Sequence, residues 1–417
     1  MERYSAFRLL KESLTGHRTW ERAWRDASPR PRYDAVIIGG GGHGLAAAYY
    51  LAKQHDVRDV AVIERGWIGG GNTGRNTTIV RSNYYYPQSV ALYELALSLY
   101  ERLAIELNYN VMFSQRSLVV TAHSRHEMER VAKLTGMMRL CGLDIDILSR
   151  DDVASAVPAL DCSDGARFPV WGGFRQRRAG TARHDAVVWG YARAASDLGV
   201  DIIQNCEAIG FEKSNSGRIV AVQTSKGRIA CDKAAIVVAG HSSVLAERAG
   251  FKLPITSYAL QAFVSEPIKP IIDVACLSWG TGVYVSQSDK GGLVFGGGLD
   301  LYPSYAQRGN IPVQKNVVGL LAEQYPAFGR IRLLRQWAGI VDVVHDSSPI
   351  IDETPVHGLY INCGWGTGGF KAIPAGGVLL AHHLATGKKH EVAAPFSFER
   401  FKTGALIDEA AGAGIAH

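Results

Sequence analysis

Three glycines and one acidic residue have the types and the spacing that binding a dinucleotide requires. Gly39, Gly41 and Gly44 form a G-x-G-x-x-G motif, and Glu64 follows the last glycine by roughly 20 residues. The first glycine permits a tight turn, the second lets backbone N–H groups approach a pyrophosphate, and the third lets a helix pack closely on a strand. Glu64 can accept hydrogen bonds from ribose hydroxyls and would repel a 2′-phosphate. The motif predicts a dinucleotide site, with FAD and NAD both open as ligands.

The elements around the motif are those that must position it. In Tyr33–Ile38, apolar and polar residues alternate at first and only apolar residues follow, which is the pattern of a strand buried on both faces. A helix with small residues on one face follows from Leu45, and Val60–Ile63 is a second apolar strand that ends at Glu64. A lone glycine motif is as often a surface turn, but here strand, helix, second strand and acid are all present. We therefore expect a βαβ unit whose helix N-terminus faces phosphates.

The composition of the chain limits the classes of protein to which it can belong. The chain has 417 residues, 47% hydrophobic and 20% charged, which are values typical of a globular protein of one or two domains. A net charge of +6 is mild and dispersed, so we expect no nucleic-acid partner. The six cysteines form no C-x-x-C pair, which predicts neither a metal site nor a disulfide framework and suits the cytoplasm. No apolar run approaches ~18 residues, so we expect no contact with a membrane.

The middle of the chain favours FAD over NAD. Short strands at 208–213, 219–224 and 229–231 predict an antiparallel meander, and Ala234–Ala239 then reads as a return to a buried strand. A meander in this place is typical of flavoproteins, and it would put the adenine near Ala208. Near the end, Leu359–Cys363 reads as a strand, and the turn at 364–377 is expected to open a helix at Val378 and to face a flavin ring.

The predicted fold is α/β (α+β), with two unlike domains. One is a Rossmann-like FAD-binding domain of the glutathione-reductase-2 type, formed by residues 33–115, 178–250 and 346–417. The other is a substrate domain with a mainly antiparallel sheet, formed by residues 116–177 and 251–345, where short strands and turns alternate. Residues 1–32 form an N-terminal arm that carries Trp20 and Trp24, and a frayed tail and a subunit-docking segment are equally open interpretations of it.

Two further segments resemble a known family. The loop Gly71–Arg81 and the turn Gly364–Lys371 are similar to those of the D-amino-acid-oxidase-like flavoproteins, and most of all to the beta subunits of heterotetrameric sarcosine oxidases. The resemblance runs from about Tyr33 to the C-terminus and implies an FAD held by residues from several segments of the chain. These are Gly39, Gly41, Gly42, His43, Gly44, Glu64, Asn72, Arg75, Asn76, Ala208, Gly366, Gly369 and Lys371.

The resemblance also implies the reaction and the partners. FAD would oxidise an N-methyl amino acid, with sarcosine as the first expectation, and pass its electrons to an FMN bound covalently through His184, beside Arg183. Alpha, gamma and delta subunits would complete the complex, with tetrahydrofolate possible on the alpha subunit. From the residues alone, His184 is an ordinary histidine at a helix entrance where Asp185 is a plausible N-cap.

The substrate carboxylate requires a cationic clamp, and Arg81 and Lys371 match the positions that supply it in monomeric relatives. By residue type alone, Arg81 would be a surface charge at a strand end and Lys371 an exposed lysine in a turn.

The chain departs from those relatives at two positions. The cysteine that links the flavin covalently in them aligns near Gly339 of this chain, which implies non-covalent FAD. A lysine that helps oxygen react in them aligns near Val294, which implies electron transfer to FMN instead.

Two alternatives remain open. A subunit of an N-methylglutamate dehydrogenase type, which passes electrons to a carrier, would share the same carboxylate clamp. A non-catalytic dinucleotide-binding scaffold would share the glycine motif but would show no bleaching of flavin absorbance with any N-methyl amino acid.

Overall fold

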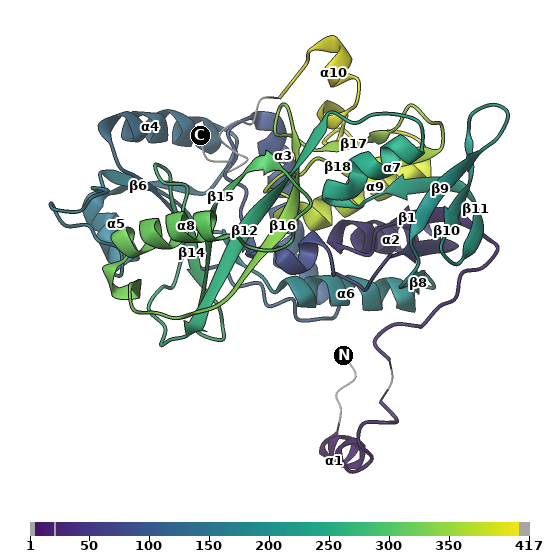
Figure 1. Ribbon diagram of the computed structural model, residues 1–417, viewed down its shortest axis with the longest axis horizontal. Coiled ribbons are helices and arrows are strands. Elements are labelled where there is room, and N and C mark those ends of the chain that lie inside the picture. The colour runs from purple at the N-terminus through teal and green to yellow at the C-terminus, as the bar shows by residue number, and fades with distance from the viewer. Residues whose placement is uncertain (1–4, 21, 408–417) are drawn as a thin grey trace.

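The structure is a computed structural model that describes residues 5–20 and 22–407. Two large β-sheets lie side by side, each with its own helices (Figure 1). A two-stranded ribbon of β3 (Ile79–Val80) and β7 (Gly180–Thr181) is separate from both sheets. None of the helices that the described residues form has the length and the apolar composition needed to cross a membrane.

The first sheet is built around parallel strands and has the order β17-β18-β11-β1-β2-β8, with β10 and β9 continuing from β11. Within it, β1 pairs in parallel with β2 and with β11. The strands at its centre are short apolar runs buried on both faces, because helices cover both sides of the sheet. Its strands are β1 (Arg32–Ile38), β2 (Val60–Ile63), β8 (Asp201–Ile203), β9 (Ala208–Lys213), β10 (Ile219–Thr224), β11 (Gly227–Ile236), β17 (Ile350–Glu353) and β18 (Leu359–Cys363).

Small residues set how closely the helices of this part approach one another. In α2, the alanines Ala46, Ala47 and Ala48 are fully buried, and the helix packs against α9 and α6. A Cβ added at Gly377 of α9 would lie 2.5 Å from the Cβ of Ala46, so the contact between the two helices depends on glycine. The helices of this part are α2 (Gly42–His55), α3 (Pro87–Glu106), α6 (His184–Asp197), α7 (Ser242–Arg248), α9 (Ile373–Thr386) and α10 (Arg400–Thr403).

The second sheet has the order β16-β12-β15-β14-β13-β4-β6-β5, and every adjacent pair is antiparallel except β13 with β4. Three helices accompany it, and α8 had no counterpart in the sequence analysis. Its elements are β4 (Leu118–Ala122), α4 (Arg125–Leu140), β5 (Ile145–Ser149), α5 (Arg150–Ala156), β6 (Gly172–Gln176), β12 (Ile255–Pro267), β13 (Ala275–Ser278), β14 (Tyr284–Gln287), β15 (Gly292–Pro303), α8 (Ile311–Gln324) and β16 (Leu333–Val344).

The chain passes between the two sheets four times. It leaves the first sheet after α3 and returns between β6 and β7, then leaves again after α7 and returns between β16 and β17. Strands of the second sheet therefore fall within residues 118–176 and 255–344. The domain limits given above stay a prediction. Short 3₁₀ helices lie in the segments that connect the longer elements, at Asn72–Arg75, Ala239–His241, Pro326–Phe328, Phe370–Ala372 and Ala394–Phe396.

Two sequence-based boundaries were wrong. The strands expected at 229–231 and 234–239 are one strand, β11, because its first residues bond β10 while the rest bond β1. The last long helix begins at Ile373 instead of Val378, so Gly376 and Gly377 lie inside α9, where they let it approach His43 and α2.

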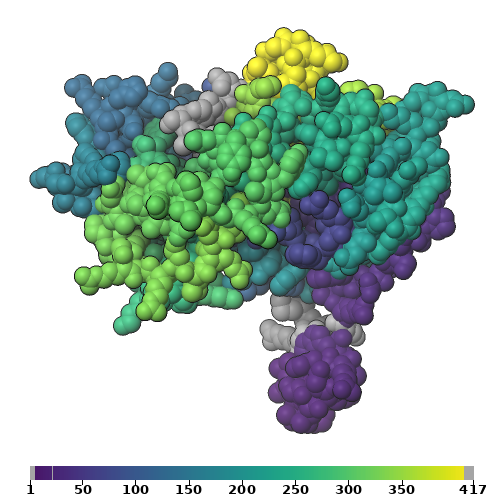
Figure 2. Space-filling view, in the orientation of Figure 1, coloured from purple at the N-terminus to yellow at the C-terminus, as the bar shows by residue number. Residues whose placement is uncertain are grey.

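The N-terminal arm has two parts. Helix α1 (Ala6–Leu14) protrudes from the body of the molecule (Figures 1 and 2) and exposes the apolar side chains of Phe7, Leu10 and Leu14. The part after residue 21 lies along the body, where the Arg30 guanidinium pairs with Asp201 at 3.0 Å and Trp24 packs against the core. The second part is therefore not a frayed tail.

Candidate active site

A cavity of about 540 Å³ lies between the two sheets, at the carboxyl ends of the parallel strands β1 and β2. Ligands of open α/β sheets bind at this edge, and the volume falls within the range of small-molecule sites. Most of the residues singled out from the sequence line it: Gly39, Gly41, Gly42, His43, Glu64, Asn72, Arg75, Asn76, Arg81, Ala208, Gly366, Gly369 and Lys371. Gly44, Arg183 and His184 lie outside its lining.

The glycine motif makes the turn between β1 and α2 that forms one wall. Gly39 has φ +121°, and a Cβ there would lie 2.2 Å from the carbonyl oxygen of Val237, so only glycine fits. Gly41 caps α2, and the N–H of Gly42 donates to Oγ1 of Thr73 at 3.0 Å. The positive end of the α2 dipole therefore faces the cavity, as an anion requires. Gly44 lies under this wall, where a Cβ would be 2.0 Å from the carbonyl oxygen of Gly39.

Glu64 is held in a fixed position at the end of β2. Its carboxylate accepts the N–H of Gly40 at 2.9 Å and the N–H of Gly66 at 2.9 Å. Because two backbone donors hold the side chain at the cavity wall, the carboxylate needs little reorganisation to accept hydrogen bonds from ribose hydroxyls.

The glycine-rich loop after β2 is attached to the second sheet. The side chain of Asn72 accepts the N–H of Ile340 at 2.8 Å and donates to the carbonyl of the same residue, so it extends the hydrogen bonding of β16. The guanidinium of Arg75 donates to the carbonyl of Gly71 at 3.0 Å, and burial followed by repulsion from Arg65 lowers its pKa. The loop that would wrap the cofactor is therefore fixed by both parts of the molecule.

A second glycine turn, residues 364–371, faces the first across the cavity. The imidazole of His43 stacks on Trp365 with ring centroids 4.6 Å apart, and its Nε2–H donates to the carbonyl of Gly369 at 2.8 Å. Burial lowers the pKa of His43 to about 4, so the ring is neutral at physiological pH. Its Nδ1 is buried and has no hydrogen-bond partner among the described residues. His43 thereby joins the start of α2 to the turn that carries Lys371.

Two cationic side chains meet in the cavity. Lys371 is 7% exposed, and its Nζ donates to the carbonyl of Thr367 at 2.9 Å. Burial, and after it the positive charge of Arg81, holds the pKa of Lys371 well below its usual range. Arg81 donates to the carbonyl and the side-chain oxygen of Asn83, both at 3.1 Å. A carboxylate placed between them would relieve the repulsion that lowers the pKa of Lys371.

Sequence reasoning missed Asp342 of β16, which also lines the cavity. Its side chain is buried and accepts the N–H of Gly364 at 2.5 Å. Burial raises the pKa of Asp342 to about 7, although several backbone donors oppose the shift. The sequence could have indicated Asp342, because it is a lone carboxylate in the apolar run Ala338–Val344. Tyr284 and Leu260 of the second sheet also line the cavity and had no signal in the sequence.

His184 begins α6, three residues after the end of β7, and it does not line the cavity. Its Nδ1 is buried and has no hydrogen-bond partner among the described residues, and burial lowers its pKa. The carbonyl of Thr78, a cavity residue, accepts the N–H of Ala182 at 3.1 Å, so the segment that ends two residues before His184 is bonded to the cavity lining. The expected N-cap was wrong, because Arg183 occupies that position.

Asp185 lies inside the first turn of α6 instead. Its carboxylate pairs with Arg183 at 3.1 Å, and Arg183 also pairs with Asp289 at 3.2 Å. Arg183 is thus a cation beside His184 that two carboxylates already hold. Among residues 5–20 and 22–407, no group of three or more His, Cys, Asp or Glu side chains is arranged to hold a metal ion.

Residues 34–383 match the sequence family described as FAD dependent oxidoreductase. The sarcosine oxidase subunit beta of Rhodobacter capsulatus is 52% identical over 417 residues, which is 100% of both chains. The subunit of the same name from an Arthrobacter species is 48% identical and covers 95% of this chain and 98% of its own.

Solved structures have the same fold. The L-proline dehydrogenase from P. horikoshii superposes with a TM-score of 0.85 at 26% identity, and the match covers 91% of this chain and 100% of that one. The glycine oxidase from Geobacillus kaustophilus superposes with a TM-score of 0.80 at 22% identity, over 89% of this chain and 99% of that one.

Proposed function

The chain belongs to the family of FAD-dependent oxidoreductases, and from this premise we propose that it oxidises the N-methyl group of an amino acid, with sarcosine as its first substrate. It is an enzyme of FAD-dependent amine oxidation. The observation that carries the choice of substrate is the pair of cations, Arg81 and Lys371, in the cavity that the glycine motif and Glu64 also line.

The residues present fit an FAD. The α2 N-terminus and the glycine turn suit its pyrophosphate, Glu64 suits its ribose, and the wall at Ala208 suits its adenine. When bound, FAD would act as the acceptor of a hydride from the carbon next to the amine nitrogen. We propose that it is bound without a covalent link, because the cavity residue Gly339 has no side chain to form one.

The cations would orient the substrate and adjust its protonation. A permanent charge on Arg81 suits a carboxylate, which guanidinium binds with two parallel hydrogen bonds. Lys371 reaches neutrality more easily than an ordinary lysine, because burial and Arg81 lower its pKa. In its neutral form Lys371 would accept a proton from the incoming secondary ammonium group, and a substrate must shed that proton before its nitrogen lone pair can assist hydride transfer.

The test is anaerobic mixing of the FAD-loaded protein with sarcosine, followed by flavin absorbance. We expect bleaching with sarcosine and almost none with sarcosinamide, which lacks the carboxylate. A Lys371→Met variant should bleach at least ~100-fold more slowly at the same sarcosine concentration. If no N-methyl amino acid bleaches the flavin, the proposed substrate class is wrong.

A second candidate substrate is N-methylglutamate. The presence of two cations in one cavity favours it, because each could bind one of its two carboxylates. The ratio of kcat/KM for sarcosine to that for N-methylglutamate decides between them, and a ratio below one would assign the chain to the dehydrogenase type.

We propose further that an FMN is attached at His184 and receives the electrons of the FAD. The proposal is supported by the unpartnered Nδ1 of His184 and by its place two residues from Ala182, whose N–H bonds to the cavity residue Thr78. Arg183 beside it would favour the anionic reduced flavin. Relatives named as a subunit of sarcosine oxidase support partner subunits, which we propose to be alpha, gamma and delta, with tetrahydrofolate on the alpha subunit.

Acid precipitation of the complex tests the FMN assignment. FMN should stay with the pellet on the peptide that contains His184, while FAD is released into the supernatant. A His184→Ala variant should keep FAD and lose the attached FMN, whereas His126→Ala, at an exposed histidine, should keep both. FMN that remains attached in His184→Ala would contradict the assignment.

A further inference from the structure

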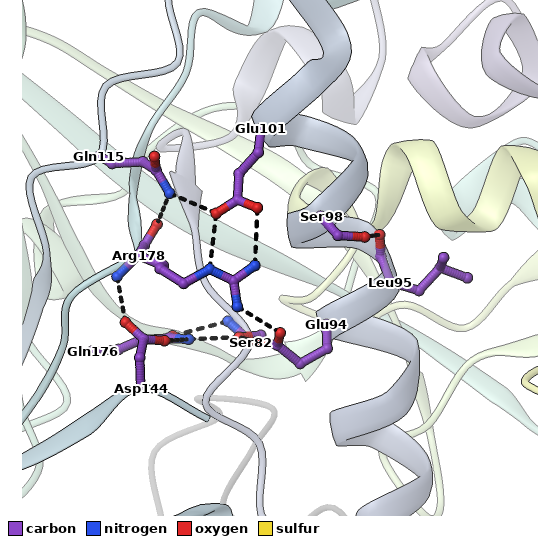
Figure 3. Close-up of polar contacts among 9 residues, drawn as sticks. All are labelled: Ser82, Glu94, Leu95, Ser98, Glu101, Gln115, Asp144, Gln176 and Arg178. Atoms are coloured by element: carbon purple, nitrogen blue, oxygen red, sulfur yellow. Dashed lines mark hydrogen bonds and ion pairs between the residues drawn. The ribbon is translucent and has the colours of Figure 1, made fainter. Parts of the chain in front are cut away.

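A dense group of polar side chains lies where the chain first leaves the first sheet and where it returns. We call it the crossing lock: Ser82, Glu94, Glu101, Gln115, Asp144, Gln176 and Arg178 (Figure 3). Gln115 belongs to the segment that leads from α3 out to β4, and Arg178 belongs to the segment that leads from β6 back to β7. The group therefore joins both crossings to α3.

Arg178 is the centre of the lock. Its guanidinium binds Glu101 through Nε at 2.8 Å and Nη2 at 3.0 Å, and Nη1 binds Glu94 at 2.8 Å. The two glutamates are seven residues apart on α3, so they present two carboxylates on one face of the helix (Figure 3). The Glu101 carboxylate raises the pKa of Arg178, and Arg178 lowers that of Glu101.

The same residue ties the two crossing segments together. The backbone N–H of Arg178 donates to Asp144 at 2.6 Å, and its carbonyl accepts the side-chain amide of Gln115 at 2.9 Å. That amide also donates to Glu101 at 2.9 Å. The return crossing is thus held by its main chain as well as by its side chain.

The lock ends at the residue that follows Arg81. Gln176 is fully buried, and its Oε1 accepts the N–H of Ser82 at 3.0 Å while its Nε2 donates to the Ser82 hydroxyl at 2.5 Å. The Ser82 hydroxyl in turn donates to Glu94. The N–H and the hydroxyl of Ser82 are therefore both held by the lock, one residue from the proposed carboxylate clamp.

We propose that the crossing lock is the positioning device for Arg81: Arg178 and Gln176 fix the backbone at Ser82, so that the guanidinium of Arg81 meets the substrate carboxylate in one place. The inference rests on the proposed function, because it requires Arg81 to bind that carboxylate. A long arginine side chain orients a ligand only if its backbone is held, and a misplacement of about 1 Å in such a group can cost about 100-fold in rate.

The test compares two neighbouring arginines. Arg178→Met removes the centre of the lock, while Arg177→Met removes a more exposed arginine that pairs with Asp146 and lies outside the lock. The probe is methoxyacetate, an analogue of sarcosine that cannot be oxidised, titrated into the FAD-loaded protein by its effect on flavin absorbance. We expect Arg178→Met to weaken its binding about tenfold and Arg177→Met to leave it unchanged.

Coupling to Arg81 separates positioning from a merely structural role. In an Arg81→Ala background, Arg178→Met should produce no further loss of methoxyacetate affinity. Equal losses in both backgrounds, or wild-type affinity in Arg178→Met, would overturn the inference. If Arg178→Met does not fold, the affinity for methoxyacetate is measured instead in Gln176→Met and Ser82→Ala, with the same expected losses. If Arg81→Ala itself binds methoxyacetate normally, the clamp assigned under the proposed function is what fails.

Discussion

At the scale of single residues, the charges in the cavity differ in how firmly they are held. Glu64 is fixed by two backbone donors, and Arg81 is a permanent cation. Lys371 and Asp342 are buried charges whose pKa values have moved toward neutrality, in each case chiefly through burial. The charges of Lys371 and Asp342 therefore respond to pH and to the charge of a ligand.

Asp342 predicts a measurable dependence of stability on pH. Its pKa is raised from 3.8 to about 7 in the folded protein, so between these values the folded state holds a proton that the unfolded state has lost. The resulting stability is present below about pH 4 and is lost as the pH rises to about 7. Asp342→Asn should remove this loss, so its stability relative to the wild type should increase by up to about 4 kcal/mol between pH 4 and pH 8.

Urea unfolding of the protein without added flavin, at both pH values, measures the effect of Asp342. Asp273→Asn, at an exposed aspartate, is the control and should follow the wild type. A variant at Asp342 whose stability relative to the wild type does not change with pH would contradict the prediction.

At the scale of elements, close approach of helices and strands gives the cavity its shape. Gly44 of α2 faces the carbonyl of Gly39, and Gly377 of α9 faces Ala46. These contacts bring the N-terminus of α2 and the turn at 364–371 to the same cavity. Side chains larger than hydrogen at these positions would separate the two walls.

Gly44→Ala tests this close packing. Its methyl group would lie 2.0 Å from a backbone oxygen, which cannot move without opening the glycine turn. We expect a loss of roughly 2–4 kcal/mol in unfolding free energy together with weaker FAD binding. Gly136→Ala is the matched control, because nothing lies within 4 Å of its added Cβ in α4, and it should be neutral or stabilising by ~0.5–1 kcal/mol. Thermal unfolding and flavin fluorescence measure the two effects.

At the scale of the whole molecule, the cavity exists only because the two sheets meet, while α1 lies away from both. Helix α1 protrudes from the body of the molecule (Figure 2), and its exposed apolar residues Phe7, Leu10 and Leu14 are poorly suited to solvent. Because relatives are named as one subunit of an oxidase, we propose that residues 1–32 include a docking segment for a partner subunit.

Replacing Phe7, Leu10 and Leu14 together by serine should reduce co-purification of the partner subunits at least ~10-fold, without changing the FAD content of this chain. Arg18→Ser, on the same arm but outside this apolar group, should leave assembly intact. Size-exclusion chromatography of the co-expressed complex measures the outcome. Normal assembly of the triple serine variant would remove α1 from the interface.

The sequence alone determined the local elements whose cause is local. The glycine motif and the strands Val60–Ile63 and Leu359–Cys363 lie where their patterns place them, because spacing and periodicity fix them within a few residues. Boundaries failed where distant segments decide them. Gly227–Ile236 is one strand because two different neighbours bond to its two halves, and α9 starts early because its glycines pack against α2.

Only the tertiary structure decided which of the singled-out residues share a site. It brings Arg81 and Lys371, 290 residues apart in the chain, into one cavity, and it places His184 outside the lining of that cavity. It also adds Asp342 and the crossing lock, whose members looked like ordinary polar residues of separate segments. The physical reason is that burial and partner charges set what a titratable or hydrogen-bonding group can do, and both are properties of the folded chain.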